Sequence, residues 1–147
     1  MSGPITISDI NAALPDLRST VPLRELHSPV DIYRDQWGIP HIQAGNEQDA
    51  FFAQGFATAQ DRLWQMDSDR HRALGRWATL VGEKGLDEGA VGISGDRLLR
   101  RLGIRNAARA DYEVSSPNAR SMLDSYAAGV NAFIETTKVL PIEYSLL

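Results

Sequence analysis

Residues 59–76 read AQDRLWQMDSDRHRALGR and combine arginines and aspartates with a clean apolar stripe. The stripe starts upstream and advances by four, three, four and three residues, through Phe52, Phe56, Ala59, Leu63 and Met66. That spacing predicts an amphipathic helix that buries one face. Asn46 is suited to cap this helix at Glu47, and the stripe continues to Gly82. We therefore expect about 35 helical residues, a long helix for a globular domain, with a bend near Gly75.

The residues before this helix predict an extension followed by a β-hairpin. Residues 1–29 hold four of the seven prolines and only scattered apolar positions. This composition is typical of an irregular surface segment, in which we expect one short helical turn at Asp9–Leu14. Two short strands are predicted at Val30–Tyr33 and Ile39–Ala44, joined by a tight turn. Pro40 has no N–H group, so it requires an edge strand or the start of a strand.

Two further helices are predicted after a glycine-rich loop at Lys84–Gly95. The first runs from about Asp96 to Tyr112, and the second starts at Ser116–Pro117, where a capping serine precedes proline, and ends before Leu140–Pro141. The residues expected to face inward are Leu98, Leu99, Leu102 and Ala108 in the first helix, and Met122, Leu123, Tyr126, Val130, Phe133 and Ile134 in the second. Striped helices with little sheet need a packing partner, so we expect a mostly helical α+β part of a larger globule.

Composition excludes several classes of protein. The 147 residues suffice for one domain with a core, and the 43% hydrophobic and 23% charged residues are close to globular averages. A net charge of −4 provides no general attraction to nucleic acid or anionic lipid. Because there is no cysteine, thiol catalysis, disulfides and cysteine-ligated zinc are excluded.

The sequence also carries no signal for a membrane. No apolar run approaches the roughly 20 residues that cross a bilayer. The N-terminal residues have neither a basic n-region nor a continuous apolar h-region. As written, the sequence predicts a cytoplasmic protein with no membrane partner, or a periplasmic or secreted one if a leader has been removed.

An apparent calcium site in the long helix has a structural alternative. Asp67, Asp69 and His71 stand at alternate positions, as ligands do in a calcium loop. Such a loop needs glycine at its sixth position and a bidentate glutamate at its twelfth, where this sequence has Arg72 and Ala78. We therefore expect no metal ligand here.

The histidines and serines show no catalytic pattern. His27, His41 and His71 share no metal-ligand spacing. We expect His71 to be solvated and His41 to serve as a hydrogen-bonded structural residue. Ser94 lies in the predicted loop without the strand-to-helix context of a nucleophile elbow. Ser2 would gain a free amine on loss of Met1, but no strand follows to hold it in a pocket.

Five arginines lie on one side of the predicted 96–112 helix: Arg97, Arg100, Arg101, Arg105 and Arg109. Such a face is able to grip phosphate. The chain is acidic, however, and no aromatic residues interleave with the arginines for base stacking. Pairing with carboxylates of a neighbouring segment is therefore the preferred interpretation, and no nucleic-acid partner is expected.

An ordered series of motifs runs from about residue 30 to the end of the sequence. It consists of YRDQWGIPHI at 33–42, AQGF at 53–56, AQDRLWQM at 59–66, GRWA at 75–78 followed by Gly82, YAAGVNAF at 126–133 and LPIEY at 140–144. This series resembles the penicillin acylase family, in the N-terminal part of its α-subunit. The resemblance divides the chain into an N-terminal extension at 1–29 and an incomplete α-subunit portion at 30–147, with the β-subunit absent.

The resemblance implies an αββα N-terminal nucleophile hydrolase that cleaves linear amide bonds. Members are made as a precursor that cuts itself into α- and β-chains. The new N-terminal serine of the β-chain is the nucleophile, and its own α-amine is the general base. Donors from the β-chain stabilise the tetrahedral oxyanion, and water then releases the acyl group. The implied partners are the β-subunit and a small N-acyl amide, such as a β-lactam antibiotic or an acyl-homoserine lactone.

The resemblance assigns no catalytic residue to this chain. The matched positions are structural in the family: Arg34, Asp35, Gly38, Pro40, His41, Gln60, Asp61, Arg62 and Arg76. Asp61 and Arg62 are expected to make polar contacts to the β-chain. No cofactor takes part in the chemistry. Many members hold a structural calcium ion, but its ligands and the acyl pocket are expected beyond Leu147, so the substrate-binding residues stay unknown.

Two alternatives from other classes stay open at the level of sequence. The first is a non-catalytic helical binding or assembly module that kept this scaffold without a β-chain. The second, nucleic-acid binding through the arginines of 97–109, ranks below it and requires steeply salt-dependent binding to DNA.

Overall fold

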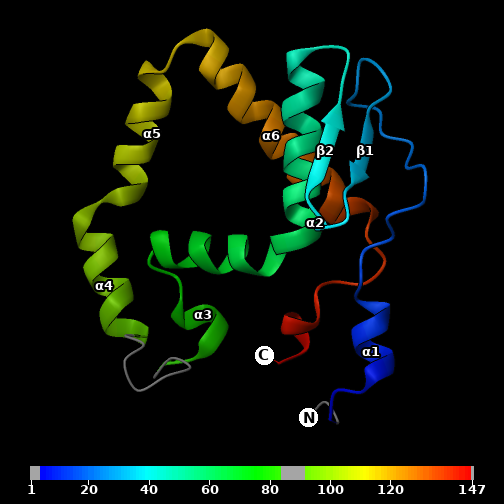
Figure 1. Ribbon diagram of the computed structural model, residues 1–147. Helices are drawn as coiled ribbons and strands as arrows, with labels where there is room; N and C mark the ends of the chain where they lie inside the picture. Colours follow the sequence, from blue (N-terminus) through cyan, green and yellow to red (C-terminus); the bar gives the residue numbers. More distant parts are fainter. Residues whose placement is uncertain (1–3, 84–91, 147) are drawn as a thin grey trace. The chain divides into compact units, whose positions relative to one another are not determined.

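A computed structural model describes residues 4–83 and 92–146 (Figure 1). The elements in chain order are α1 (Ile7–Ala12), β1 (Asp31–Arg34), β2 (Pro40–Gln43), α2 (Glu47–Ala73), α3 (Ala78–Val81), α4 (Gly92–Leu102), α5 (Ile104–Val114), α6 (Pro117–Thr136) and the 3-10 helix η1 (Ile142–Leu146). The prediction of a mostly helical chain with an N-terminal hairpin is confirmed. None of the described helices has the length and apolar character needed to cross a membrane.

The described residues form two compact units. The first contains the residues up to Leu63 together with Ser116–Ile142, and the second contains those between Trp64 and Ser115 together with the residues after Ile142. The first unit therefore holds the hairpin, the N-terminal part of α2 and the whole of α6, while the second holds α3, α4 and α5.

The hairpin has the predicted position with slightly different bounds. Strands β1 and β2 pair antiparallel, with Ile32 opposite Ile42 and Arg34 opposite Pro40. Pro40 is the first residue of β2, the place in a strand where a missing N–H group costs least. The extension before the hairpin contains α1, which begins two residues earlier than the expected helical turn at Asp9–Leu14.

Helix α2 begins where the sequence predicts but ends earlier. The Asn46 side chain accepts a hydrogen bond from the Asp49 N–H at 2.8 Å, as a capping residue does. Gly75 has a φ of 62°, and two backbone bonds, Gly75 N to Arg72 O and Arg76 N to His71 O, close a Schellman motif. The expected helix of about 35 residues is therefore wrong, because α2 stops at Ala73 and α3 is separate.

A second departure lies inside α2. Arg62 has φ and ψ angles of −140° and 23°, outside the helical region, so two helical segments meet there. The predicted bend near Gly75 is the end of the helix, and the kink falls instead within the AQDRLWQM motif. Neither proline nor glycine marks the kink in the sequence.

Two glycines allow α2 and α6 to cross at very close range in the first unit (Figure 1). A Cβ atom added to Gly55 would overlap the carbonyl oxygen of Tyr126 and lie 2.9 Å from its carbonyl carbon. A Cβ atom added to Gly129 would overlap the carbonyl oxygen of Phe52. Phe52 is buried, as is Phe133 of α6, so the crossing is part of the core.

The second unit contains a pair of helices where the sequence predicts one. Gly103 has a left-handed φ of 68° and separates α4 from α5, so the single helix predicted for 96–112 is wrong. The predicted loop at Lys84–Gly95 lies largely outside the described residues, and its last four residues belong to α4. Buried Asp96 of α4 accepts hydrogen bonds from Trp77 N at 2.8 Å and Ala78 N at 3.0 Å, which caps α3.

Several residues predicted to face inward are exposed. In α4 and α5, Leu98 is 57% exposed, Leu102 is 63% exposed, and Ala108 is exposed. In α6, Leu123 and Ile134 are also exposed. An apolar stripe identifies the face that a helix buries when a partner covers it, and within 4–83 and 92–146 no element covers these positions.

Candidate functional site

Most of the residues that the sequence analysis selected meet where the hairpin contacts α2. Arg34 of β1 donates from both terminal nitrogens to the Asp61 carboxylate, at 2.9 and 2.8 Å. The same guanidinium donates to Gln60 Oε1 at 2.9 Å and to the Gly38 carbonyl at 3.0 Å. The Arg34 side chain is only 13% exposed. A bidentate, half-buried ion pair of this kind fixes both distance and orientation, so Arg34 clamps the hairpin onto α2.

The clamp gives a first prediction. Replacing Arg34 with alanine should destabilise the chain by about 1–2 kcal/mol, and lysine should restore little because it cannot form the bidentate fork. Urea denaturation of Arg34→Ala, Asp61→Ala and the double variant measures the coupling. Arg109→Ala is the matched control, because the Arg109–Glu113 pair is 82% and 63% exposed and should contribute almost nothing. Independent, additive effects of the two clamp substitutions would contradict this assignment.

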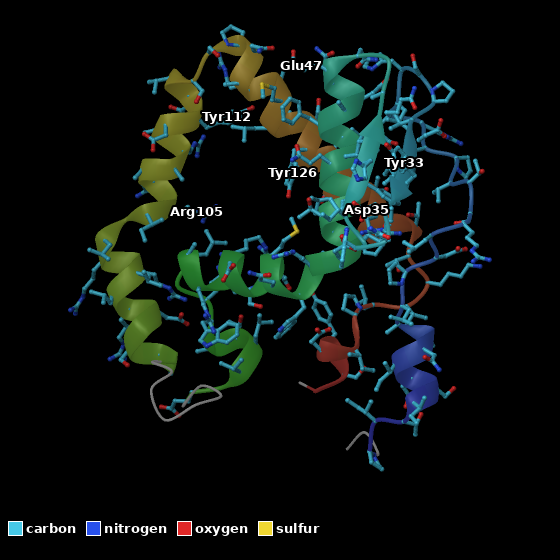
Figure 2. All side chains as sticks on the ribbon, viewed as in Figure 1. Tyr33, Asp35, Glu47, Arg105, Tyr112 and Tyr126 are labelled. Carbon is cyan, nitrogen blue, oxygen red and sulfur yellow. The ribbon has the colours of Figure 1, made fainter. Side chains whose placement is uncertain are left out.

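Asp35 organises the turn of the hairpin. Its Oδ1 accepts hydrogen bonds from Trp37 N at 2.8 Å and Ile39 N at 3.0 Å. Its Oδ2 lies 3.1 Å from His41 Nε2, and this hydrogen bond is the main reason why the pKa of the Asp35 carboxyl lies below its ordinary value. The ring of His41 stacks on Tyr33 at a centroid distance of 4.9 Å. This geometry fits the structural role expected of His41, and Figure 2 shows Tyr33 and Asp35 on the hairpin beside α2.

The hydrogen bonds of this cluster do not include the other two motif residues, Arg62 and Arg76. Arg62 is exposed at the kink of α2, and Arg76 is exposed in the second unit, where its N–H group helps to end α2. Asp61 is bound by Arg34 of this chain, and its expected contact to the β-chain stays a prediction. The structure thus unites Arg34, Asp35, Gly38, Pro40, His41, Gln60 and Asp61 in the hairpin and the adjoining turn of α2.

Asp49 of α2 is a buried carboxylate that no sequence motif identifies. Its side chain is 1% exposed and accepts hydrogen bonds from His27 N at 2.9 Å, Ser28 N at 3.0 Å and the Asn46 side chain. Burial raises the pKa of Asp49, but these hydrogen bonds outweigh it and bring the pKa below the ordinary value. Asp49 therefore ties the N-terminal extension to the start of α2.

Asp67 forms a third polar cluster, in the second unit. Tyr144 of η1 donates to Asp67 Oδ2 at 3.2 Å, and its ring packs edge-on against Trp64. His71 Nδ1 lies 2.9 Å from the Asp67 carbonyl oxygen and 3.2 Å from Asp67 Oδ1. The His71 side chain is only 15% exposed, so the expectation that it is solvated is wrong. Because residues 67 and 71 are about one helical turn apart, the His71 ring lies against its own helix.

The Tyr144 contact gives a second prediction. Burial, followed by the charge and hydrogen bond of Asp67, raises the pKa of Tyr144 from 10.0 to about 12. A raised tyrosine pKa contributes stability that is complete below pH 10 and is lost as the pH rises towards 12. Ultraviolet titration of phenolate should therefore show a late step that disappears in Tyr144→Phe. If the titration step that Tyr144→Phe removes has its midpoint near pH 10, the contact between Tyr144 and Asp67 is contradicted.

The contacts of the histidines and serines described below are structural, and none of them pairs a nucleophile with a base. Each histidine ring lies within 3.3 Å of an aspartate carboxylate. The Ser115 hydroxyl donates to the Asp111 carbonyl, and the Ser116 hydroxyl accepts from the Ala119 N–H. Ser94 belongs to α4 and not to a loop, and Ser2 lies outside the described residues. Within 4–83 and 92–146, no group of three or more histidine, aspartate or glutamate residues is placed to hold a metal ion.

Comparison with known proteins decides the family. The family model described as penicillin amidase matches residues 29–147. The chain belongs to the penicillin amidase family. The match spans the hairpin, α2 and α6, and the part of the chain before the match contains α1.

Curated members of the penicillin amidase family show the same relationship. The chain is 46% identical over 138 residues to penicillin acylase 2 proenzyme from Pseudomonas sp. strain SE83, covering 94% of this chain and 17% of that protein. It is 39% identical over 122 residues to acyl-homoserine lactone acylase QuiP from Pseudomonas aeruginosa, covering 83% of this chain and 14% of that protein. The chain thus spans only about a sixth of the length of these relatives.

A solved structure from the penicillin amidase family confirms the fold assignment. Thermostable penicillin G acylase from Alcaligenes faecalis matches with a TM-score of 0.67 and 30% sequence identity. The match covers 80% of this chain and 60% of that chain. The fold described here is therefore that of part of a penicillin G acylase chain, as the motif series predicts.

Proposed function

We propose that this chain is the N-terminal part of the α-portion of an amidase that hydrolyses the linear amide bond of N-acyl compounds. The observation that carries the proposal is membership of the penicillin amidase family together with relatives named penicillin acylase and acyl-homoserine lactone acylase. The substrate class common to those names is a small molecule with an acyl group on an amide nitrogen. Residues 30–147 form this α-portion in our proposal, and residues 1–29 are an extension.

The nucleophile in this proposal belongs to a β-portion of the same precursor. The N-terminal serine of that portion attacks the acyl carbonyl, and its own α-amine takes the hydroxyl proton. The C–N bond then breaks, the amine leaves with that proton, and water hydrolyses the acyl-enzyme to release the acid and free the serine. Donors of the β-portion stabilise the oxyanion. The polar groups described here support this proposal because their roles are structural. Arg34, Asp49 and Asp67 each hold separate segments of the chain together.

The α-portion contributes to catalysis through rigidity. Catalytic groups act only when held close to their productive geometry, so a scaffold that shifts by an ångström lowers the rate strongly. The clamp of Arg34 and the tie of Asp49 supply such support for elements that a partner packs against. No cofactor takes part in this chemistry. Any structural calcium ion of the complete enzyme would take its ligands from outside this chain.

Activity assays test the proposal. The 147-residue chain alone should release no product from penicillin G or from an N-acyl-homoserine lactone. The protein expressed with the coding sequence that follows residue 147 should be cleaved into two chains and hydrolyse at least one N-acyl amide. Hydrolysis by the isolated chain would overturn the placement of the nucleophile. A longer protein that is inactive on all N-acyl amides would favour a non-catalytic assembly module.

A further inference from the structure

The turn of the hairpin presents an aromatic side chain to solvent. Trp37 is 77% exposed, although tryptophan is usually well buried. Its neighbours Tyr33 and Ile39 are 58% and 55% exposed, so three apolar side chains share one end of the hairpin. Isolated exposed apolar residues are normal, but a group of large ones on one turn indicates an interaction surface.

The turn that carries Trp37 is held by hydrogen bonds within the chain. Asp35 accepts from the N–H groups of Trp37 and Ile39, and Gly38 has a φ of 78° that favours glycine. The Gly38 carbonyl accepts from Arg34, which is itself bound to Asp61 of α2. The N–H groups of Trp37 and Ile39 and the Gly38 carbonyl are therefore bound within the chain, and the exposed side chains of Trp37 and Ile39 lie on a fixed backbone. A preorganised turn loses little entropy when it binds.

We propose that Trp37 anchors this chain to the remainder of the acylase polypeptide, the part that follows Leu147. This inference rests on the proposed function. It gives the motif around Arg34, Asp35 and Gly38 a purpose, which is to fix one tryptophan in position for docking. Aromatic anchors of this kind dominate interface energies when polar groups with satisfied hydrogen bonds surround them.

Two observations favour that occupant. The chain spans 17% of the length of its 46% identical relative, so most of such a protein is available as the partner. Trp37 also lines none of four cavities in the described residues, the largest of which is formed by residues 19–23 and 26–32 with Phe52, Ala53 and Phe56. A side chain at the tip of a turn, outside these cavities, is suited to enter a pocket of another protein surface and unsuited to enclose a small substrate.

Hydroxyl-radical footprinting of the longer protein tests the proposal residue by residue. Docking should lower the exposure of Trp37 from 77% to near the 6% of Trp77, about a tenfold loss of reactive area. Trp37 should therefore be oxidised about as slowly as Trp77, and about tenfold more slowly than in the urea-unfolded protein. Oxidation of Trp37 at the unfolded rate would overturn the proposal. Because this readout does not depend on turnover, it is separate from a failure of the proposed amidase activity.

A variant series provides the second arm. Trp37→Ala should lower the yield of mature two-chain protein by about tenfold or more, the loss expected for an aromatic anchor, and Trp37→Phe should restore part of it. Ile7→Ala is the matched control, because Ile7 is equally exposed at 77% but lies before the family match. The circular dichroism of the 147-residue chain should not change in any variant. A wild-type yield from Trp37→Ala would overturn the proposal.

Discussion

Alanine at Gly129 or Gly55 should abolish stable folding of the first unit. Each substitution places a Cβ atom inside a backbone carbonyl of the opposite helix, with further atoms only 2.7 Å (Phe52 C) or 2.9 Å (Tyr126 C) away. Backbone cannot move aside as a flexible side chain does, so the whole crossing of α2 and α6 must separate. We expect a loss of about 3 kcal/mol or more for either variant, measured as the urea midpoint of the circular dichroism signal.

Gly45→Ala is the matched control for this prediction. A Cβ atom at Gly45 would lie 3.8 Å from the Ser28 side chain, an ordinary contact, and Gly45 has no left-handed φ. Its stability should stay within about 0.5 kcal/mol of the original chain. A Gly129→Ala variant that unfolds at the same urea concentration as Gly45→Ala would refute the close crossing. The crossing also brings Phe56 and Phe133 into edge-to-face contact at 5.5 Å, so its loss should expose both rings.

Removing the Asp49 carboxylate should have the second-largest effect. Asp49→Ala leaves the N–H groups of His27 and Ser28 and the Asn46 side chain without their acceptor. It also leaves a small cavity where the carboxylate was. We expect a loss of about 2–3 kcal/mol in the free energy of unfolding. Asp69→Ala, an exposed position of the same helix, is the control and should change little.

The same carboxylate predicts a pH dependence. The pKa of Asp49 lies below its ordinary value of 3.8 in the folded chain, so its ionised form is the one that folding stabilises. Its contribution is complete above pH 3.8 and is lost progressively as the pH falls through the folded pKa. Urea denaturation at a series of pH values should show the original chain and Asp49→Ala converging in acid. A constant difference between them down to the lowest pH would contradict the role of the charge.

The sequence predicts the elements whose signals are local. The cap at Asn46, the helix start at Ser116–Pro117 and the proline at the start of β2 depend on residues that are neighbours in the chain, and all three appear as expected. The kink at Arg62 carries no local signal, because neither proline nor glycine stands there. Gly103 does mark the break between α4 and α5, but an isolated glycine is also tolerated inside a helix, so it does not decide the break from sequence. The apolar spacing is therefore right about periodicity and wrong about where helices end.

The polar contacts also divide into those that the sequence indicates and those that only the fold reveals. The residues Arg34, Asp35 and Asp61 stand out because they belong to the motif series that resembles a known family. Asp49 does not stand out, and Asp67 attracts notice only in an apparent calcium loop. Their partners His27 and Tyr144 lie 22 and 77 residues away, and no spacing rule links them. The close approach at Gly55 and Gly129 is invisible for the same reason, since a glycine in a helix looks like a weak position until the opposite backbone is in place.

In the proposed function this chain supports a catalytic centre that belongs to the β-portion, and locating the nucleophile tests that assignment most directly. The longer protein is treated with a serine-reactive sulfonyl fluoride until hydrolysis of an N-acyl amide stops, and the adduct is then mapped by mass spectrometry. We predict a single stoichiometric adduct on the N-terminal serine of a second chain and none on residues 1–147. An adduct on a serine of this chain that forms in step with the loss of activity would contradict the account.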